Sequence, residues 1–144
     1  MQNSMLSGKT SIYECHLRPQ IVLHHETDCG FTVHNVAWIP SSPRLIAVGT
    51  TLQNNGIIHV YTMGRELSKL QEIKLEHGLN CVTFKSSSLT DRRLAVGDYG
   101  GRVYQYDFEE SKEVWGLRGH EVVNCIDGVG GSGVGPAEIV TGGR

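Results

Sequence analysis

The stretch Val33-His34-Asn35-Val36-Ala37-Trp38 reads as an alternating β-strand with one face directed at a core. The stretch Leu79-Asn80-Cys81-Val82-Thr83-Phe84 reproduces this pattern, with Val82 standing 46 positions after Val36. A third copy, Val123-Asn124-Cys125-Ile126-Asp127, follows after a further 44 positions. A pattern that returns at a nearly fixed spacing indicates that consecutive segments form the same structural unit.

Two further elements recur in the same register. The first is Leu45-Ile46-Ala47-Val48-Gly49, which returns as Leu94-Ala95-Val96-Gly97 and as Ile139-Val140-Thr141-Gly142. The second is Gly56–Thr62, which returns as Gly101–Asp107. Each copy of the second element begins at an Asn-Gly or Gly-Gly dipeptide, and these dipeptides tolerate the positive φ of hairpin turns. The repeated unit is therefore a series of β-hairpins.

A weaker fourth strand completes each of the first two units, at residues 70–75 and 113–117. Four short strands in a period of about 45 residues are typical of the WD40 blade of a β-propeller. The sequence therefore predicts an all-β fold, a partial WD40 propeller of about two and a half four-stranded blades.

We expect blades at residues 33–75 and 79–117 and an incomplete blade at 120–144, within a propeller unit that spans 20–144. Residues 20–26 resemble the N-terminal strand that closes the last blade of a propeller, although its partner strands are not in this chain. Residues 1–19 are expected to form a flexible tail. An open stack leaves unpaired edges at both ends, which favours oligomers or aggregates.

Signature residues of WD blades are present in part. Gly119-His120 is the dipeptide that opens a blade, and His77 keeps the histidine at the start of the preceding one. Tyr106-Asp107 takes the place of Trp-Asp at the end of a third strand, and Tyr61 is a weaker version of the same position. We interpret all six residues as structural.

The hydrogen-bond relay of a WD blade also needs a hydroxyl on the second strand and an Asp in the following turn. The first two units have Val48 and Val96 on that strand, and Asn55 and Gly100 in that turn. The relay cannot be complete in these units, so their blades must depend on apolar burial.

Composition excludes several classes of protein. The 144 residues carry 13 Lys and Arg against 15 Asp and Glu, and the basic residues are scattered, so a nucleic-acid-binding face is not expected. No apolar stretch approaches the ~20 residues that span a bilayer. The four cysteines form no C-x-x-C pair, which favours free thiols in the cytoplasm over disulfides or a zinc site.

The segment Gly128–Gly133 matches the dinucleotide fingerprint G-x-G-x-x-G, but a strand rather than a helix is expected after it. A flexible interstrand loop is the better interpretation, and Gly130 and Gly133 could contact a partner there. No nucleophile elbow or paired-carboxylate site is present, so we expect no enzyme activity, no cofactor and no metal.

Surface recognition is then the default function of such a fold. Tyr99 and Arg102 flank a turn, and Arg65 follows a strand, so these residue types are candidates for partner binding. Trp38 and Trp115 lie in expected strands and are predicted to be core residues.

The runs from Leu94 to Val103 and from Gly119 to Gly142, with the glycine-rich insert of the second run, resemble the WD-repeat dynein axonemal assembly factors. Pro19-Gln20-Ile21-Val22 resembles the start of such proteins, so the likeness covers about residues 19–144. The resemblance implies a scaffold or co-chaperone that supports assembly of axonemal dynein heavy chains, its clients, with a prefoldin-like chaperone assembly and RuvB-like ATPases.

Two alternatives stay open. The chain ends at Arg144, where a third strand is expected to begin, so it is also interpreted as a truncated WD-repeat fragment without independent activity. The other alternative is a general WD40 module that binds proteins or peptides.

Overall fold

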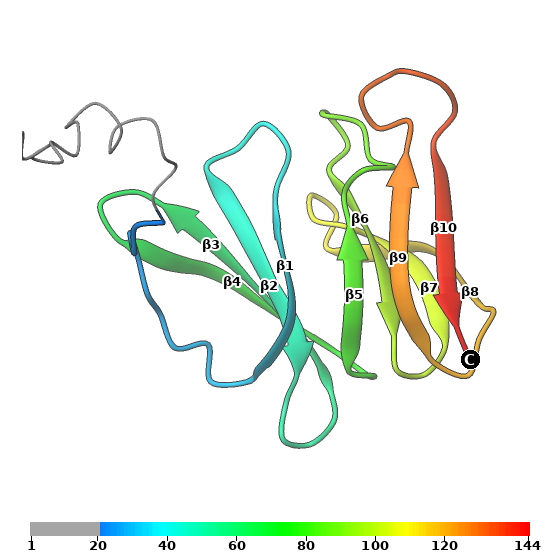
Figure 1. Cartoon of the computed structure of the whole chain (residues 1–144), viewed down its shortest axis with the longest axis horizontal. Helices are drawn as coiled ribbons and strands as arrows, with labels where there is room; N and C mark the ends of the chain where they lie inside the picture. Colours follow the sequence, from blue (N-terminus) through cyan, green and yellow to red (C-terminus); the bar gives the residue numbers. More distant parts are fainter. Residues whose placement is uncertain (1–20) are drawn as a thin grey trace, which may run out of the picture.

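The computed structural model describes residues 21–144, and these residues form ten strands in three antiparallel sheets (Figure 1). No helix occurs among the described residues, and so none there is long and apolar enough to cross a membrane. The expected all-β class is confirmed. The tail expected at residues 1–19 lies outside the described part of the chain.

Each sheet takes its strands in chain order. The first blade consists of β1 (Thr32–Trp38), β2 (Arg44–Thr50), β3 (Gly56–Met63) and β4 (Leu67–Leu75). The second blade consists of β5 (Leu79–Thr83), β6 (Arg93–Asp98), β7 (Arg102–Asp107) and β8 (Lys112–Arg118). The third sheet holds β9 (Val123–Val129) and β10 (Glu138–Gly143). These sheets match a partial WD40-like propeller of two full blades and a half.

The segment before the first blade forms no regular structure. Residues 21–29 carry no strand, and Ile21 is fully exposed. The strand expected over 20–26 is therefore not formed over 21–26, and residue 20 is outside the described range. Its role in closing a propeller stays a prediction, because the partner strands were expected outside this chain.

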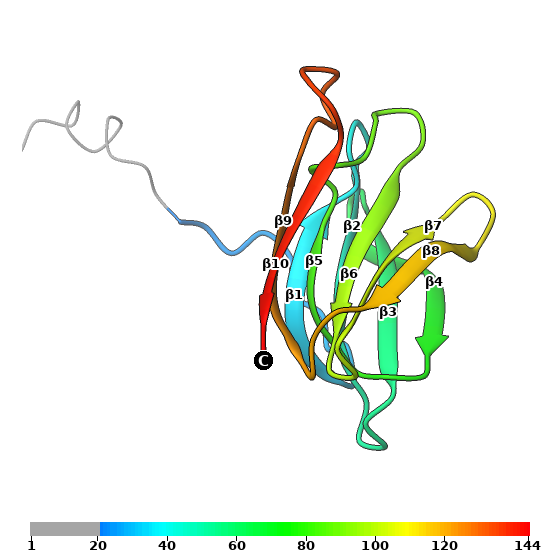
Figure 2. The same ribbon diagram turned by 90° about the vertical axis from the view of Figure 1, so that its right-hand side faces the viewer.

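The first strand of each sheet faces the same side of the molecule. Strands β1 and β5 lie side by side, as do β5 and β9, and Figure 2 shows these inner strands along one side with β4 and β8 along the other. The sheets therefore fan out from a common inner edge, with their faces packed on one another.

The larger core fills the space between the first and second blades. Ile46, Val48 and Ile58 of the first blade share one buried cluster with Leu94 and Tyr104 of the second. Such burial removes apolar surface from water, and it stabilises the fold by about 25 cal/mol per Å². Neither blade alone can bury this surface.

Alternation along the strands gives the second blade two buried faces. On β7, Tyr104 and Tyr106 belong to the cluster with the first blade, whereas Val103 belongs to a smaller cluster with Cys81 and Val123. Val123 is fully buried, and a Cβ at Gly97 would lie 2.5 Å from its Cγ1 atom. The absence of a side chain at Gly97 therefore makes room for Val123.

Each inner strand contains a β-bulge at the same place. The ladder shifts between Val33 and Asn35, between Leu79 and Cys81, and between Val123 and Cys125, which leaves His34, Asn80 and Asn124 as the extra residues. Asn80 uses its position to donate to the carbonyl oxygens of Val123 at 2.9 Å and of Asn124 at 3.4 Å. A side chain of the second blade thus holds the backbone of the third sheet.

In the first blade, the recurring glycine of the second strand lies one residue later in the strand register than in the other two sheets. Gly97 pairs with Cys81 and Gly142 pairs with Cys125, whereas Gly49 pairs with Val33. The residues opposite Val36, Val82 and Ile126 are Ala47, Val96 and Thr141, so the expectation that Val48 occupies the relay position is corrected to Ala47. The first two relay positions still lack a hydroxyl.

The prediction that both tryptophans are core residues is wrong. Trp38 is 56% exposed and Trp115 is 39% exposed. Trp38 matches Phe84 in the repeat, and Phe84 is buried against the first blade, but no described sheet precedes the first blade to cover Trp38. Trp115 lies on β8, where every residue is exposed, and it faces the side of the two-stranded third sheet, which does not cover it.

A short strap covers part of the face of the first blade that points away from the second. The Phe31 ring meets the His59 ring edge-on at 4.8 Å, and the Tyr61 hydroxyl donates to Cys29 Sγ at 3.4 Å. His59 lies between Tyr61 and Glu72. Its Nδ1 atom is 3.0 Å from the Tyr61 hydroxyl oxygen, and its Nε2 atom is 3.0 Å from Glu72 Oε2. A chain of polar contacts therefore joins the strap to β3 and β4.

We expect Gly97→Ala to loosen the third sheet from the second blade. The added methyl group overlaps Val123 and the Cys81 thiol, and overpacking of this kind costs about 1–3 kcal/mol. Limited proteolysis should cut first between Arg118 and Val123, at a lower protease concentration than in the parent. Gly64→Ala is the control, because the nearest atom to its Cβ is 3.9 Å away. Equal protection of both variants would contradict the proposed packing role.

The melting temperature should fall as pH drops below 6.5, and His59 should contribute to the fall. Burial, with Lys69 nearby, lowers the pKa of His59 from 6.5, although Glu72 opposes the shift. A proton therefore binds the unfolded chain more readily than the folded chain. The contribution of neutral His59 to the free energy of unfolding is present above pH 6.5 and is lost as the pH falls. Thermal melts of the parent and His59→Gln between pH 7 and pH 5 measure it, and parallel pH profiles would refute it.

Candidate functional site

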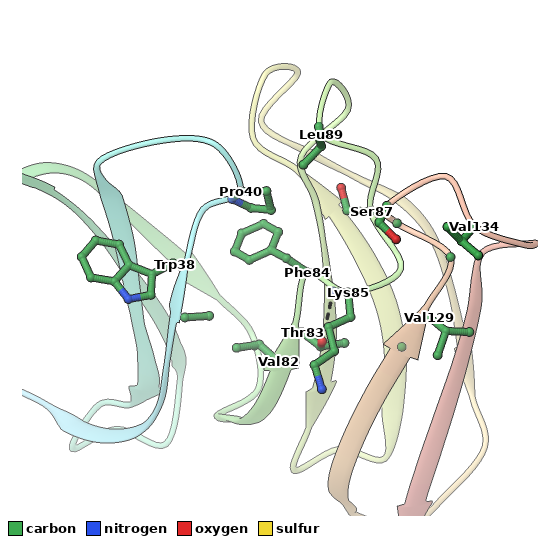
Figure 3. Close-up of a pocket in the computed structure, with 15 residues that line it drawn as sticks. Trp38, Pro40, Val82, Thr83, Phe84, Lys85, Ser87, Leu89, Val129 and Val134 are labelled. Atoms are coloured by element: carbon green, nitrogen blue, oxygen red, sulfur yellow. Dashed lines mark hydrogen bonds between the residues drawn. The ribbon is translucent and has the colours of Figure 1, made fainter. Parts of the chain in front are cut away.

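A groove opens at the end of the inner strands where the loops β1–β2, β5–β6 and β9–β10 gather. It has a volume of about 740 Å³, and it lies between the first blade, the second blade and the third sheet (Figure 3). We call it the inter-blade groove. Its lining includes Trp38, Pro40, Phe84, Leu89, Val129 and Val134.

The wall of the groove is mostly apolar and open to solvent. Leu89 is 56% exposed, Val129 is 60% exposed and Val134 is 82% exposed, whereas the Trp38 ring points away from the groove (Figure 3). Phe84 is buried among them and anchors the groove to the core between the blades. Exposed apolar side chains that line one concavity are typical of a site that receives another apolar group.

One ion pair crosses the groove from the second blade to the third sheet. Lys85 Nζ lies 2.9 Å from Asp127 Oδ1 and 3.1 Å from Oδ2. The bond from Lys85 holds the pKa of the Asp127 carboxyl below its ordinary value. Both side chains are more than half exposed, so solvent screens the attraction between them. Its main effect is to place charge beside an apolar surface.

The β5–β6 loop that carries Leu89 is held by hydrogen bonds of its own. The hydroxyl of Ser87 accepts the Arg93 N–H at 2.7 Å, and that of Ser88 accepts the Asp91 N–H at 2.9 Å. Ser87 is buried. These bonds hold the backbone on both sides of Leu89.

The glycine-rich loop forms the opposite lip of the groove. Gly130 and Gly133 have φ values of 86° and 82°, a region that L residues rarely adopt. The Gly131 N–H donates to the Lys85 carbonyl at 2.9 Å, which ties this loop to the second blade. Strand β10 follows the loop, so the helix that a dinucleotide fingerprint requires does not follow it.

Tyr99 and Arg102 lie at the other end of the sheets, on the β6–β7 turn. The Tyr99 hydroxyl donates to Asn80 at 3.1 Å, and its ring meets that of His34 at 5.5 Å beside a smaller cavity of about 510 Å³. Arg102 pairs with Glu113 at 2.7 Å and lies 5.2 Å from the centre of the Tyr104 ring. Both residues thus have partners within the chain.

Arg65 is exposed in the β3–β4 loop. The structure therefore does not bring the expected partner-binding residues together. Gly130 borders the inter-blade groove and Gly133 lies in the same loop, whereas Tyr99 and Arg102 are at the opposite end of the second blade. Their roles in binding stay predictions.

The blade-opening residues behave differently in the two units. His120 Nε2 lies 3.0 Å from the hydroxyl of Thr141, and the Gly119 N–H donates to the Gly101 carbonyl at 3.2 Å. These contacts join the third sheet to the turn of the second blade. The side chain of His77 is 44% exposed and lies 4.0 Å from Glu76, so it has no equivalent hydroxyl partner.

The residues that end the third strands are buried. Tyr61 and Tyr106 are 3% and 6% exposed, and burial raises the pKa of both phenols. Asp107 accepts the backbone N–H groups of Glu109 at 2.9 Å and Glu110 at 3.1 Å. These bonds, with Arg93 nearby, hold the pKa of the Asp107 carboxyl below its usual range. Asp107 therefore fixes the turn after β7.

The described residues offer little for covalent or metal chemistry. No group of three or more potential metal ligands gathers within residues 21–144. Burial raises the pKa of the Cys81 thiol to about 11, which keeps it protonated at neutral pH.

Sequence reasoning missed the residues that build the groove. Leu89 and Val134 are single apolar residues inside polar or glycine-rich loops, and this placement was the available signal. Trp38 was assigned to the core because it lies in a strand. Only the arrangement of three sheets brings these residues to one concavity.

No family model matches the chain. Among curated proteins, it is 39% identical over 132 residues to dynein axonemal assembly factor 10 of Xenopus laevis. It is 36% identical over 132 residues to the proteins of that name in Homo sapiens and Chlamydomonas reinhardtii. Each alignment covers 88% of this chain and 37% of the relative.

The chain thus spans little more than a third of the length of the curated relatives that it matches. The resemblance seen in the repeat and in the glycine-rich insert is confirmed by these alignments. Over 88% of its length the chain is similar to the curated proteins named dynein axonemal assembly factor 10.

Proposed function

We propose that the chain is a non-enzymatic scaffold that supports assembly of axonemal dynein in the cytoplasm. The observation that carries this proposal is the similarity to dynein axonemal assembly factor 10 over 88% of the chain. The sheet architecture supports it, because rigid strands position loops for recognition and the described residues hold no cluster of metal ligands.

In this proposal the inter-blade groove binds an apolar segment of a client polypeptide. Leu89, Val129 and Val134 provide apolar surface that is already exposed, so binding needs no opening of the core. Burial of such surface contributes about 25 cal/mol per Å², and a preformed groove keeps the ordering cost low. Dynein heavy chains are the proposed clients.

The partners proposed for the scaffold follow from the family resemblance. They are a prefoldin-like chaperone assembly and RuvB-like ATPases. Neither nucleic acid nor a membrane is part of the proposal, because the net charge is −2 and the basic residues are scattered.

A second candidate function is a general peptide-binding module, and the groove itself favours it. Such a module would bind apolar peptides through the same residues without any preference for dynein. The truncated fragment without independent activity is the third interpretation. The three are distinguished by which proteins the chain captures and by whether capture needs the groove.

We expect Leu89→Asp and Val134→Asp each to reduce capture of dynein heavy chains at least fivefold. Each change places a charge on the apolar wall of the groove, while the exposure of both side chains predicts an unchanged melting temperature. The measurement is affinity purification of the tagged chain from ciliated cells, with quantitative detection of heavy chains and RuvB-like ATPases.

Leu52→Asp is the matched control, since Leu52 is 95% exposed in the β2–β3 loop at the other end of the first blade. Capture of many unrelated apolar proteins, lost in both groove variants, would favour the general module instead. Absence of any captured protein from the parent chain would favour the inactive fragment.

A further inference from the structure

The inter-blade groove has one charged residue in its lining. This residue is Lys85, and every other described residue of the lining is uncharged. The side chain of Lys85 is 68% exposed, so its charge is accessible from solvent. Figure 3 shows this side chain between the second blade and the third sheet. The groove therefore offers a single positive charge to a segment that occupies it.

The main chain of Lys85 is held at both of its hydrogen-bonding groups. Its N–H donates to the Thr83 hydroxyl at 3.2 Å, and its carbonyl accepts the Gly131 N–H at 2.9 Å. The flexible four-carbon stem of a lysine allows the ammonium group to move around such a fixed root. The charge can therefore reach different positions in the groove while the backbone stays in place.

The carboxylate that now pairs with Lys85 has another hydrogen-bond donor. Asp127 Oδ1 lies 2.9 Å from Lys85 Nζ, and it also accepts the Gly128 N–H at 2.9 Å. The Asp127 side chain is 56% exposed, so water can solvate it as well. Moving the ammonium from Asp127 to a second carboxylate therefore leaves no buried charge without a partner.

An occupant of the groove strengthens the electrostatic effect of Lys85. The apolar side chains of an incoming segment exclude water around the ammonium, and opposite charges attract more strongly when the local dielectric constant is low. A carboxylate beside those side chains is attracted to Lys85, whereas a basic residue in the same place is repelled. The groove therefore discriminates by charge between segments that are equally apolar.

One ammonium group matches one negative charge. A carboxylate carries a single charge, whereas a phosphate monoester carries nearly two at neutral pH and is bound best by the planar fork of an arginine. No arginine is among the described residues that line the groove. An Asp or Glu side chain therefore fits the groove better than a phosphorylated side chain does.

We propose that the groove recognises an acidic, apolar segment of a client polypeptide. An Asp or Glu of the segment pairs with Lys85, and its aliphatic neighbours pack on Leu89, Val129 and Val134 of the wall. Asp127 competes with the segment for the ammonium group and loses it on binding. The inference rests on the proposed binding role of the groove, and it adds the charge of the segment that is bound.

Fluorescence anisotropy of labelled peptides, titrated with the full chain, tests this recognition. The first probe has the core Leu-Leu-Asp-Leu-Leu between Gly-Ser spacers, with both ends blocked, and two matched probes carry Asn or Lys in place of Asp. We expect the Asp probe to bind about fivefold more tightly than the Asn probe, and the Lys probe to bind most weakly. High salt should reduce the difference between the Asp and Asn probes.

Two substitutions should change the affinity for the Asp probe in opposite directions. Lys85→Met keeps an unbranched apolar stem and removes the charge, so it should abolish the preference for Asp over Asn. Asp127→Asn removes the competing charge, and its amide oxygen can still accept the Gly128 N–H, so it should tighten binding of the Asp probe about threefold. An ion pair that only joined the third sheet to the second blade would make both variants weaker for every probe.

Lys74→Met is the matched control for loss of a surface lysine. Lys74 lies on β4, its side chain is 76% exposed, and it forms a solvent-exposed pair with Glu72 at 3.7 Å. This variant should keep the full preference for the Asp probe.

The Asn probe separates failure of the inference from failure of the proposed function. If none of the probes binds the parent chain, both the binding role of the groove and this inference are overturned. If the Asp and Asn probes bind equally and Leu89→Asp abolishes binding of the Asn probe, the groove remains a binding site and the inference alone is overturned.

Two further probes distinguish the source of the negative charge. One carries phosphoserine in place of Asp, and the other carries Asn and a free C-terminal carboxylate. Tighter binding of either one than of the Asp probe overturns the assignment to an acidic side chain. A preference for Asp that disappears in Lys85→Met and increases in Asp127→Asn supports the proposal.

Discussion

The fold depends on burial of apolar sheet faces between neighbouring blades. A four-stranded antiparallel sheet with two apolar faces has no stable core of its own, and it must pack on a second sheet. Leu94 and Val96 of the second blade share one buried cluster with Ile46 and Ile58 of the first. The groove, the bulges and the exposed faces all follow from where this packing is present and where it stops.

The repeat could be predicted from the sequence because its signal is local. Alternation, turn dipeptides and a period of about 45 residues define each strand without reference to its neighbours, and the strands at Leu79–Thr83 and Arg102–Asp107 lie where they were expected. The one-residue shift of Gly49 was not predictable in this way. Cross-strand register depends on where a bulge falls, and Val33 rather than Asn35 stands opposite that glycine.

The candidate site could be predicted only in part. Gly130 borders the groove as the glycine-rich loop suggested, but Trp38 was assigned to the core and Leu89 was not singled out. Whether an apolar strand residue is buried depends on the presence of a sheet in front of it. Phe84 and Trp38 hold the same place in the repeat, yet within residues 21–144 only Phe84 has such a sheet, and no local pattern separates them.

The bond from Asn80 has an evolutionary consequence. Its acceptors are the main-chain carbonyls of Val123 and Asn124, which every amino acid possesses. The bond itself tolerates drift in its neighbour's side chains, and only the packing of Val123 against Gly97 and Cys81 depends on which side chain is present. Tandem duplication of the gene segment can therefore add a unit that fits at once, which offers a simple route by which propellers with different blade numbers arise.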